Sequence, residues 1–132
     1  MTFLGFKIFR AKRRAGGGFK TVFQTDGKRL SRAKAAMKTK LQSIMHMKVE
    51  EQAARINSLL VGHFNYYGMA GNTRRLGAFR EFTVRYWRKS LSRRSQNGGM
   101  TWAKMSKVFE TCSLCPARIR IGYPMLTSYA RL

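Results

Sequence analysis

The chain has 132 residues, and its 27 Lys and Arg against 5 Asp and Glu give a formal net charge of +22 at pH 7. The length suits one domain, and 44% hydrophobic residues exclude intrinsic disorder because they suffice for a core. Such an excess of positive charge predicts a polyanionic partner, with nucleic acid ahead of an anionic membrane surface.

The sequence has no run of 18 apolar residues and no signal-peptide core, because the basic cluster at residues 10–14 interrupts the first apolar segment. We therefore expect an intracellular protein with no membrane partner.

Two short aromatic-rich segments, residues 3–9 and 19–23, have the composition of β-strands. A basic cluster and three consecutive glycines lie between them, which predicts a β-hairpin with a flexible, basic tip. Arg13 and Arg14 in this tip are candidate contacts for RNA phosphates. A two-stranded hairpin is marginal alone, so we expect it to pack on the rest of the chain.

The next two segments have apolar residues spaced by three and four, as in amphipathic helices. Ser31 is the predicted N-cap of the first helix, which runs to about Met45. The second begins near Val49 and is ended by Gly68. Its predicted apolar positions include Ile56, and the full set is Val49, Ala53, Ile56, Leu60, Phe64 and Tyr67.

A third helix is predicted from about Thr73 to Gln96, with Asn72 as its N-cap. Rotation by about 100° per residue divides it into two faces. The mainly apolar face holds Leu76, Phe79, Phe82, Thr83, Tyr86, Trp87 and Ser90. The basic face holds Arg74, Arg75, Arg85, Arg88, Lys89 and Arg93.

Arg74 and Arg75 stand in the first turn of this third helix, where the helix dipole disfavours each cation by about 0.3 to 1 kcal/mol. Residues placed against a local preference indicate an outside reason, such as a bound phosphate. A solvated basic face is the alternative explanation. The six cations of this face are our main candidates for RNA binding.

A fourth, short helix is predicted after the Gly98–Gly99 break, with Thr101 as its cap and Pro116 as its end. Its spacing places Trp102, Met105, Phe109 and Cys112 on one face, which is typical of a core rather than of a cofactor site. The tail that follows is predicted to be irregular and adds Arg118, Arg120 and Arg131.

The sequence predicts no catalytic centre, no metal site and no cofactor. Of the five acids, only Glu50 and Glu51 are neighbours, and adjacent helical residues point about 100° apart. Cys112 and Cys115 form a lone CxxC, which supplies half of a zinc site. No phosphate-binding loop or hydrolase motif is present.

Residues for binding single-stranded or irregular RNA are abundant, because cations hold the backbone and planar side chains stack on bases. Tyr66 lies at the end of the second predicted helix, beside a glycine-rich break and just before Arg74 and Arg75. It is our candidate for base stacking, whereas Tyr67 and Phe64 are expected in the core.

Four motifs in order resemble the C-terminal part of bacterial group II intron reverse transcriptase/maturases, of the group IIC-like class. They are FLGFKI at 3–8, ARINSLLVGHFNYYG at 54–68, RYWRKSLSRRSQNGGMTW at 85–102 and PARIRIGYP at 116–124. The first is similar to the last reverse-transcriptase block, where palm passes into thumb. The second is similar to the core of the maturase-specific, or X, domain.

The resemblance implies a mainly α fold: a three- to four-helix thumb-like bundle with an N-terminal β-hairpin. Residues 1–28 would be the hairpin that ends the palm, and residues 29–132 the helical maturase domain with its irregular tail. His63 departs from the family, which often has a bulky aromatic residue such as Trp there. The YxDD polymerase motif and an HNH-type endonuclease segment are both absent from this sequence.

The implied function is binding of folded group II intron RNA for splicing, without an active site, in the bacterial cytoplasm. The template-primer duplex is a further implied ligand. One alternative is the thumb of a split RNA-directed DNA polymerase with a separate fingers-palm chain, in which case an upstream reading frame would encode YxDD. A generic structural RNA-binding protein and a decayed gene remnant are the others. Co-sedimentation with ribosomes would indicate the structural RNA-binding protein, and absence of cooperative unfolding would indicate the gene remnant.

Overall fold

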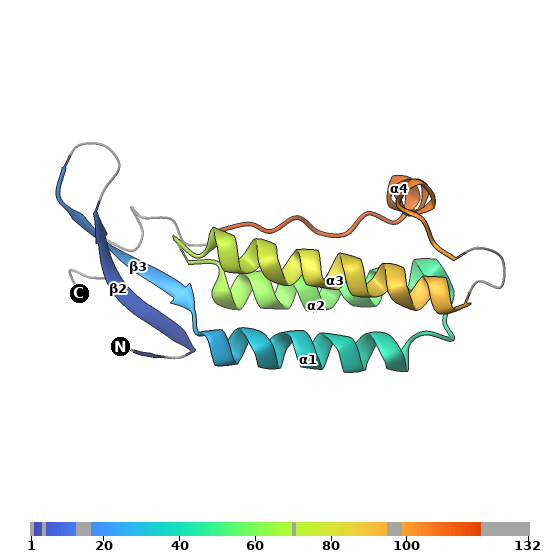
Figure 1. The fold of residues 1–132 in the computed structure, drawn as a ribbon, viewed down its shortest axis with the longest axis horizontal. Helices are drawn as coiled ribbons and strands as arrows, with labels where there is room; N and C mark the ends of the chain where they lie inside the picture. The colour runs from blue at the N-terminus through green and yellow to red at the C-terminus, as the bar shows by residue number, and fades with distance from the viewer. Residues whose placement is uncertain (1, 4, 13–16, 70, 95–98, 120–132) are drawn as a thin grey trace.

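The computed structural model describes residues 2–3, 5–12, 17–69, 71–94 and 99–119. It is mainly helical, with a small antiparallel sheet at one end of a bundle of long helices (Figure 1). This confirms the predicted helical bundle with its N-terminal hairpin. Among the described residues, no helix combines the length and apolar character needed to cross a membrane.

The sheet has three strands in the order β1-β2-β3: β1 (Thr2–Phe3), β2 (Phe6–Lys12) and β3 (Phe19–Thr25). β2 and β3 form the main hairpin, with Phe6 opposite Thr25 and Lys12 opposite Phe19. The segment predicted as one strand over residues 3–9 is divided at Gly5, whose φ of 86° permits the tight turn between β1 and β2. The predicted tip contacts Arg13 and Arg14 lie outside the described residues.

The first two helices are α1 (Gly27–Ser43) and α2 (Val49–Tyr67). The prediction of Ser31 as the N-cap of α1 was wrong, because Asp26 occupies the cap position and the helix begins directly after β3. This earlier start brings Leu30 into the core. α2 has the predicted bounds, and its first turn carries Glu50 and Glu51, which suit the helix dipole.

The remaining helices are α3 (Thr73–Arg94) and α4 (Trp102–Thr111). Thr101 caps α4 as predicted, because its hydroxyl accepts a hydrogen bond from the Lys104 amide at 3.3 Å. α4 ends at Thr111, before the predicted stop at Pro116. The chain then runs back along the bundle, with Leu114 buried in the core (Figure 1).

The core lies between α1, α2 and α3, and α4 adds Met105 to it. The predicted apolar positions of α2 point inward, and Ile56, Leu60 and Phe64 are fully buried. Trp87 of α3 is also fully buried, and its indole Nε1 donates to Oε1 of Gln52 at 3.0 Å. Gln52 Nε2 in turn donates to the Met47 carbonyl at 2.9 Å, so one buried polar side chain joins α3, α2 and the α1–α2 connection.

Asn72 fixes the sheet to the bundle. It precedes α3 as predicted, but its side chain bonds to the sheet. Oδ1 accepts from the Thr25 amide at 2.8 Å, and Nδ2 donates to Thr25 Oγ1 at 2.8 Å and to the Tyr67 carbonyl at 2.8 Å. Both Asn72 and Thr25 are buried, so these groups have little access to water.

We predict that Asn72→Ala lowers the free energy of unfolding by about 1 to 3 kcal/mol, because the buried Thr25 amide and hydroxyl lose their partner. Urea unfolding followed by circular dichroism measures this. Asn65→Ala, at an exposed position of α2, is the matched control and should change stability little. Equal losses in the two variants would contradict the assigned role of Asn72.

His63 takes an aromatic position on the inner side of α2. Its ring stacks on Phe79 of α3, with centroids 3.9 Å apart and planes 19° from parallel, and it also packs against Tyr67 at 4.8 Å. Burial lowers the pKa of His63 from 6.5 to about 4, because the charged imidazolium would lose hydration. The ring therefore packs as a neutral aromatic group at pH 7.

This pKa shift predicts a stability that depends on pH. Between pH 6.5 and about 4, the unfolded chain binds a proton at His63 that the folded chain does not bind. Stability should therefore fall as the pH drops through this interval and level off below it. The expected loss is about 1 to 2 kcal/mol, because water reaches part of the ring and screens the charge.

Urea unfolding at about pH 5 and pH 7 measures the effect. His63→Phe keeps the stack on Phe79 and should reduce the difference between the two pH values. His46→Gln, at an exposed position between α1 and α2, should leave that difference intact. An unchanged difference in His63→Phe would show that another group causes it.

Candidate nucleic-acid interface

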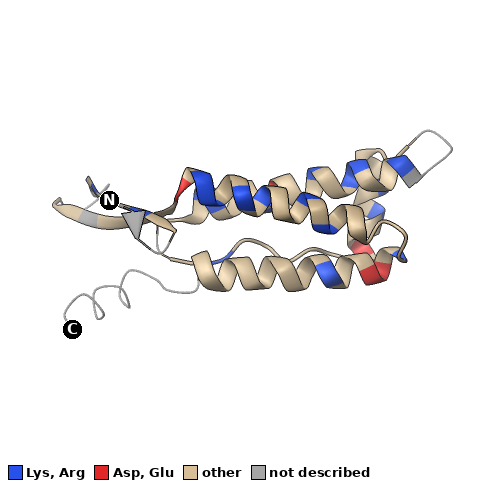
Figure 2. Ribbon diagram, turned by 90° about the horizontal axis from the view of Figure 1, so that it is seen from below, with Lys and Arg blue, Asp and Glu red and all other residues tan. Residues whose placement is uncertain are grey.

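Positive charge is concentrated on α1 and α3, which pack against each other. α1 carries no acid, and its cations are Lys28, Arg29, Arg32, Lys34, Lys38 and Lys40. α3 carries one acid, Glu81, among eight cations. By contrast, α2 has Arg55 as its one cation. Figure 2 shows blue at intervals along α1, whereas α2 is mostly tan with red in its first turn.

The candidate residues of α3 do not all have the predicted exposure. Arg74, Arg85, Lys89 and Arg93 are exposed, and Arg75 is half-buried. In the part of the chain that the structure describes, one salt bridge is present, between Arg85 and Glu81 one helical turn apart. Both partners are more than half exposed, so this pair contributes little stability. The surface therefore remains strongly positive.

Arg88 does not belong to the exposed basic face, which corrects the sequence prediction. Its Nη1 donates to the Met100 carbonyl at 2.9 Å, and its guanidinium lies 4.8 Å from the centroid of the Trp102 ring. Trp102 is itself 51% exposed, so its predicted core position was also wrong. Arg88 turns toward α4 because its position on α3 borders the buried face. It holds α4 rather than facing solvent.

Tyr66 is 56% exposed at the end of α2, as expected for a stacking candidate. Its ring is nearly parallel to that of Phe6 in β2, with an angle of 9° and centroids 6.4 Å apart, and it packs edge-on against Tyr67 at 4.6 Å. Tyr66 thus lies where the sheet meets the bundle, away from the basic groove described next. Phe64 is in the core as predicted, and Tyr67 is half-buried against it.

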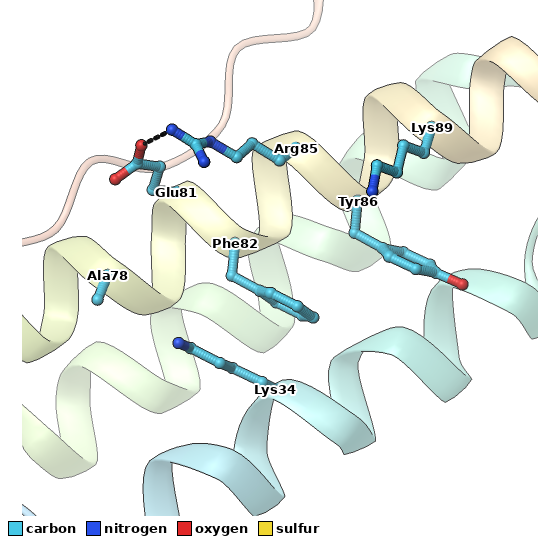
Figure 3. A pocket seen from close by; sticks show the side chains of 7 residues that line it. All are labelled: Lys34, Ala78, Glu81, Phe82, Arg85, Tyr86 and Lys89. Atoms are coloured by element: carbon cyan, nitrogen blue, oxygen red, sulfur yellow. Dashed lines mark hydrogen bonds and ion pairs between the residues drawn. The ribbon is translucent and has the colours of Figure 1, made fainter. Parts of the chain in front are cut away.

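A groove of about 350 Å³ lies between α1 and α3. Phe82 and Tyr86 line it with rings 18° from parallel and centroids 6.1 Å apart. The sequence placed both rings on the apolar face of α3, but they are only half-buried at its edge. The lining residues, shown in Figure 3, are Lys34, Ala78, Glu81, Phe82, Arg85, Tyr86 and Lys89.

Two lysines of α1 contribute charge to this groove, and neither was a predicted site residue. Lys34 Nζ lies 5.7 Å from the Phe82 ring centroid, and Lys38 Nζ lies 5.7 Å from that of Tyr86. Gln42, two turns after Lys34, donates to the Tyr86 hydroxyl at 3.0 Å. The spacing of Lys34 and Lys38 by four residues was a usable signal, because it puts both on one side of α1. Their position opposite Phe82 and Tyr86 required the helix pairing.

The two cysteines lie in a part of the chain that the structure describes. Among the described residues, no three His, Cys, Asp or Glu side chains come together. Cys112 and Cys115 are free thiols in the segment after α4. Asn57 Oδ1 accepts from the Cys115 amide at 2.7 Å, and Arg80 Nε donates to the Cys115 carbonyl at 3.0 Å, so the backbone here serves to attach the segment.

Comparison of the chain with protein-family models, with curated proteins and with solved structures finds no match. The interface combines two adjacent basic helices with a groove whose aromatic rings lie among cations.

The revised role of Arg88 predicts that Arg88→Gln destabilises the chain by about 1 to 3 kcal/mol, since a charged hydrogen bond and a cation–π contact are lost. Thermal unfolding followed by circular dichroism measures this. Arg85→Gln removes the same charge from an exposed position one turn away and should change stability by less than about 0.5 kcal/mol. Similar effects of the two variants would place Arg88 back on the free basic face.

Proposed function

We propose that this chain is an RNA-binding maturase domain that stabilises folded group II intron RNA for splicing in the bacterial cytoplasm. The exposed cations of α1 and α3 would neutralise phosphates, while the RNA performs its own chemistry. The observation that carries this proposal is the adjacency of the two helices, whose cations have one carboxylate partner among the described residues. The four motifs that resemble those of maturases, in the same order, support group II intron RNA as the class of ligand.

The physical basis is release of condensed counterions from the RNA. Each phosphate that a Lys or Arg neutralises frees counterions, so affinity falls steeply with salt. Arginine predominates on α3, and its planar guanidinium can bind a phosphate through two hydrogen bonds. Arg74, Arg85 and Arg93 are exposed for such contacts, and Lys89 adds a point charge beside the groove.

A second candidate is the thumb of a split polymerase that works with a separate fingers-palm chain. The exposed aromatic residues of the sheet favour it, because Phe9 and Phe19 are 39% and 64% exposed. The two functions differ in the preferred ligand. A maturase domain should favour intron RNA, whereas a thumb should favour a template-primer duplex.

The test compares two variants in which four cations are replaced by Gln. The first changes Arg74, Arg85, Lys89 and Arg93, and we expect weaker binding to a group II intron transcript. The slope of log affinity against log salt should decrease by about 0.7 to 0.9 for each lost phosphate contact, and hence by up to about 3 to 4. Fluorescence anisotropy over a salt series provides both quantities.

The control variant changes Lys48, Arg55, Lys107 and Arg118, which are exposed on other elements. It removes the same formal charge and should reduce the slope less. Equal effects of the two variants would show that net charge, rather than the α1–α3 surface, determines binding. A ribosomal RNA fragment of equal length and a template-primer duplex distinguish the intron-specific function from general RNA binding and from the thumb.

A further inference from the structure

The rings of Phe82 and Tyr86 are placed differently from the other large apolar side chains of α3. Leu76, Phe79 and Trp87 are buried, whereas Phe82 and Tyr86 border the groove and are half-buried. Their rings are nearly parallel and point from α3 toward α1 (Figure 3). In the groove they are bordered by Lys34, Arg85 and Lys89. An aromatic surface among cations matches a ligand that is both planar and anionic.

We propose that this groove binds one unpaired nucleotide of an RNA, with its base against the Phe82–Tyr86 rings and its flanking phosphates on Lys34, Lys38 and Lys89. This inference rests on the proposed RNA-binding function and specifies the part of the RNA that the α1–α3 surface recognises. Stacking on side-chain rings requires a base that is free of its helical neighbours. A fully paired helix can reach the same surface through its phosphates alone.

The lysines near the rings do not prevent stacking. A cation–π contact at an exposed site changes an equilibrium by about 2- to 5-fold, whereas a base stacked on an aromatic side chain is worth about 5- to 150-fold in affinity. The incoming base therefore displaces the ammonium groups of Lys34 and Lys38. Their flexible side chains keep them close enough to contact the adjacent phosphates.

The size and charge of the groove agree with this ligand. Its volume of about 350 Å³ lies at the lower end of the roughly 300 to 1,000 Å³ typical of small-molecule sites. Glu81 is the single acid among the lining residues, and it is paired with Arg85 on the outer side of α3 (Figure 3). A carboxylate repels phosphate, so the backbone of the RNA should follow the lysines of α1 and Lys89 instead.

The first experiment uses the unchanged protein and three RNAs. They are a duplex of about 16 base pairs, the same duplex with one bulged nucleotide, and the same bulge without its base. We expect the bulged RNA to bind about 5- to 150-fold more tightly than the paired duplex, and the abasic bulge to lose this gain. Equal affinity for the three RNAs would overturn the nucleotide site while leaving the proposed function standing.

The second experiment assigns the preference to the rings. Phe82→Leu combined with Tyr86→Leu keeps apolar side chains in the groove and should abolish the preference for the bulged RNA. Binding of the paired duplex and its salt slope should change by less than about twofold, since the cations remain. Circular dichroism of the variant, compared with that of the unchanged protein, shows whether it is folded.

Trp102→Leu is the matched control, because it removes an exposed aromatic ring of α4 outside the groove. It should retain the preference for the bulge. Persistence of the preference in the Phe82 and Tyr86 variant would overturn the proposed site. Failure of the unchanged protein to bind any of the three RNAs at low salt would overturn the proposed function together with the site.

Discussion

The main constraint on this structure is electrostatic. Its elements must be held together although the chain has very few carboxylates to pair with its cations. With 27 cations and 5 acids, ion pairs cannot balance the charge of the chain, and the part that the structure describes has one exposed pair. The buried connections are neutral instead. Gln52 links Trp87 to the α1–α2 connection, and Asn72 links Thr25 to the end of α2. Neutral amides can be buried with satisfied hydrogen bonds at far lower cost than charges. Apart from partly buried arginines such as Arg80 and Arg88, most of the described cations are left at the surface, where they repel one another until an anion is bound.

This constraint also accounts for the different roles of the helices. α2 has apolar residues on its inner side and a single cation, so it serves as the packing partner of both basic helices. α1 and α3 contact each other and carry most of the described charge. Their junction includes two aromatic rings because Phe82 and Tyr86 lie at the border between the buried and exposed faces of α3. The groove thus arises where a hydrophobic edge meets two rows of cations.

Much of the fold could be predicted from the sequence, because helical periodicity is a local property. The bounds of α2 and the cap of α4 follow from it. Residue type alone predicts Ser31 as the cap of α1, whereas Asp26 occupies that position because β3 ends beside it and Leu30 must reach the core. The exposed cations of α3 were also predictable. Arg88 was not, since its partners Met100 and Trp102 belong to a separate element. The groove was not predictable either, because periodicity within one helix does not show that Lys34 and Lys38 of α1 face Phe82 and Tyr86 of α3.

The attachment of the segment after α3 has a consequence for how freely its sequence can vary. Arg88 donates to the Met100 carbonyl, Arg80 to the carbonyls of Leu114 and Cys115, and Asn57 to that of Ser113. Backbone carbonyls are present whatever the side chain, so these donors hold the position of the chain without specifying its residues. Apart from Trp102 and the side chains that pack on the core, exposed side chains of this segment such as Ala103 and Lys107 can be exchanged without loss of the attachment. The segment is therefore a suitable place for introducing labels or new contacts while the bundle keeps its structure.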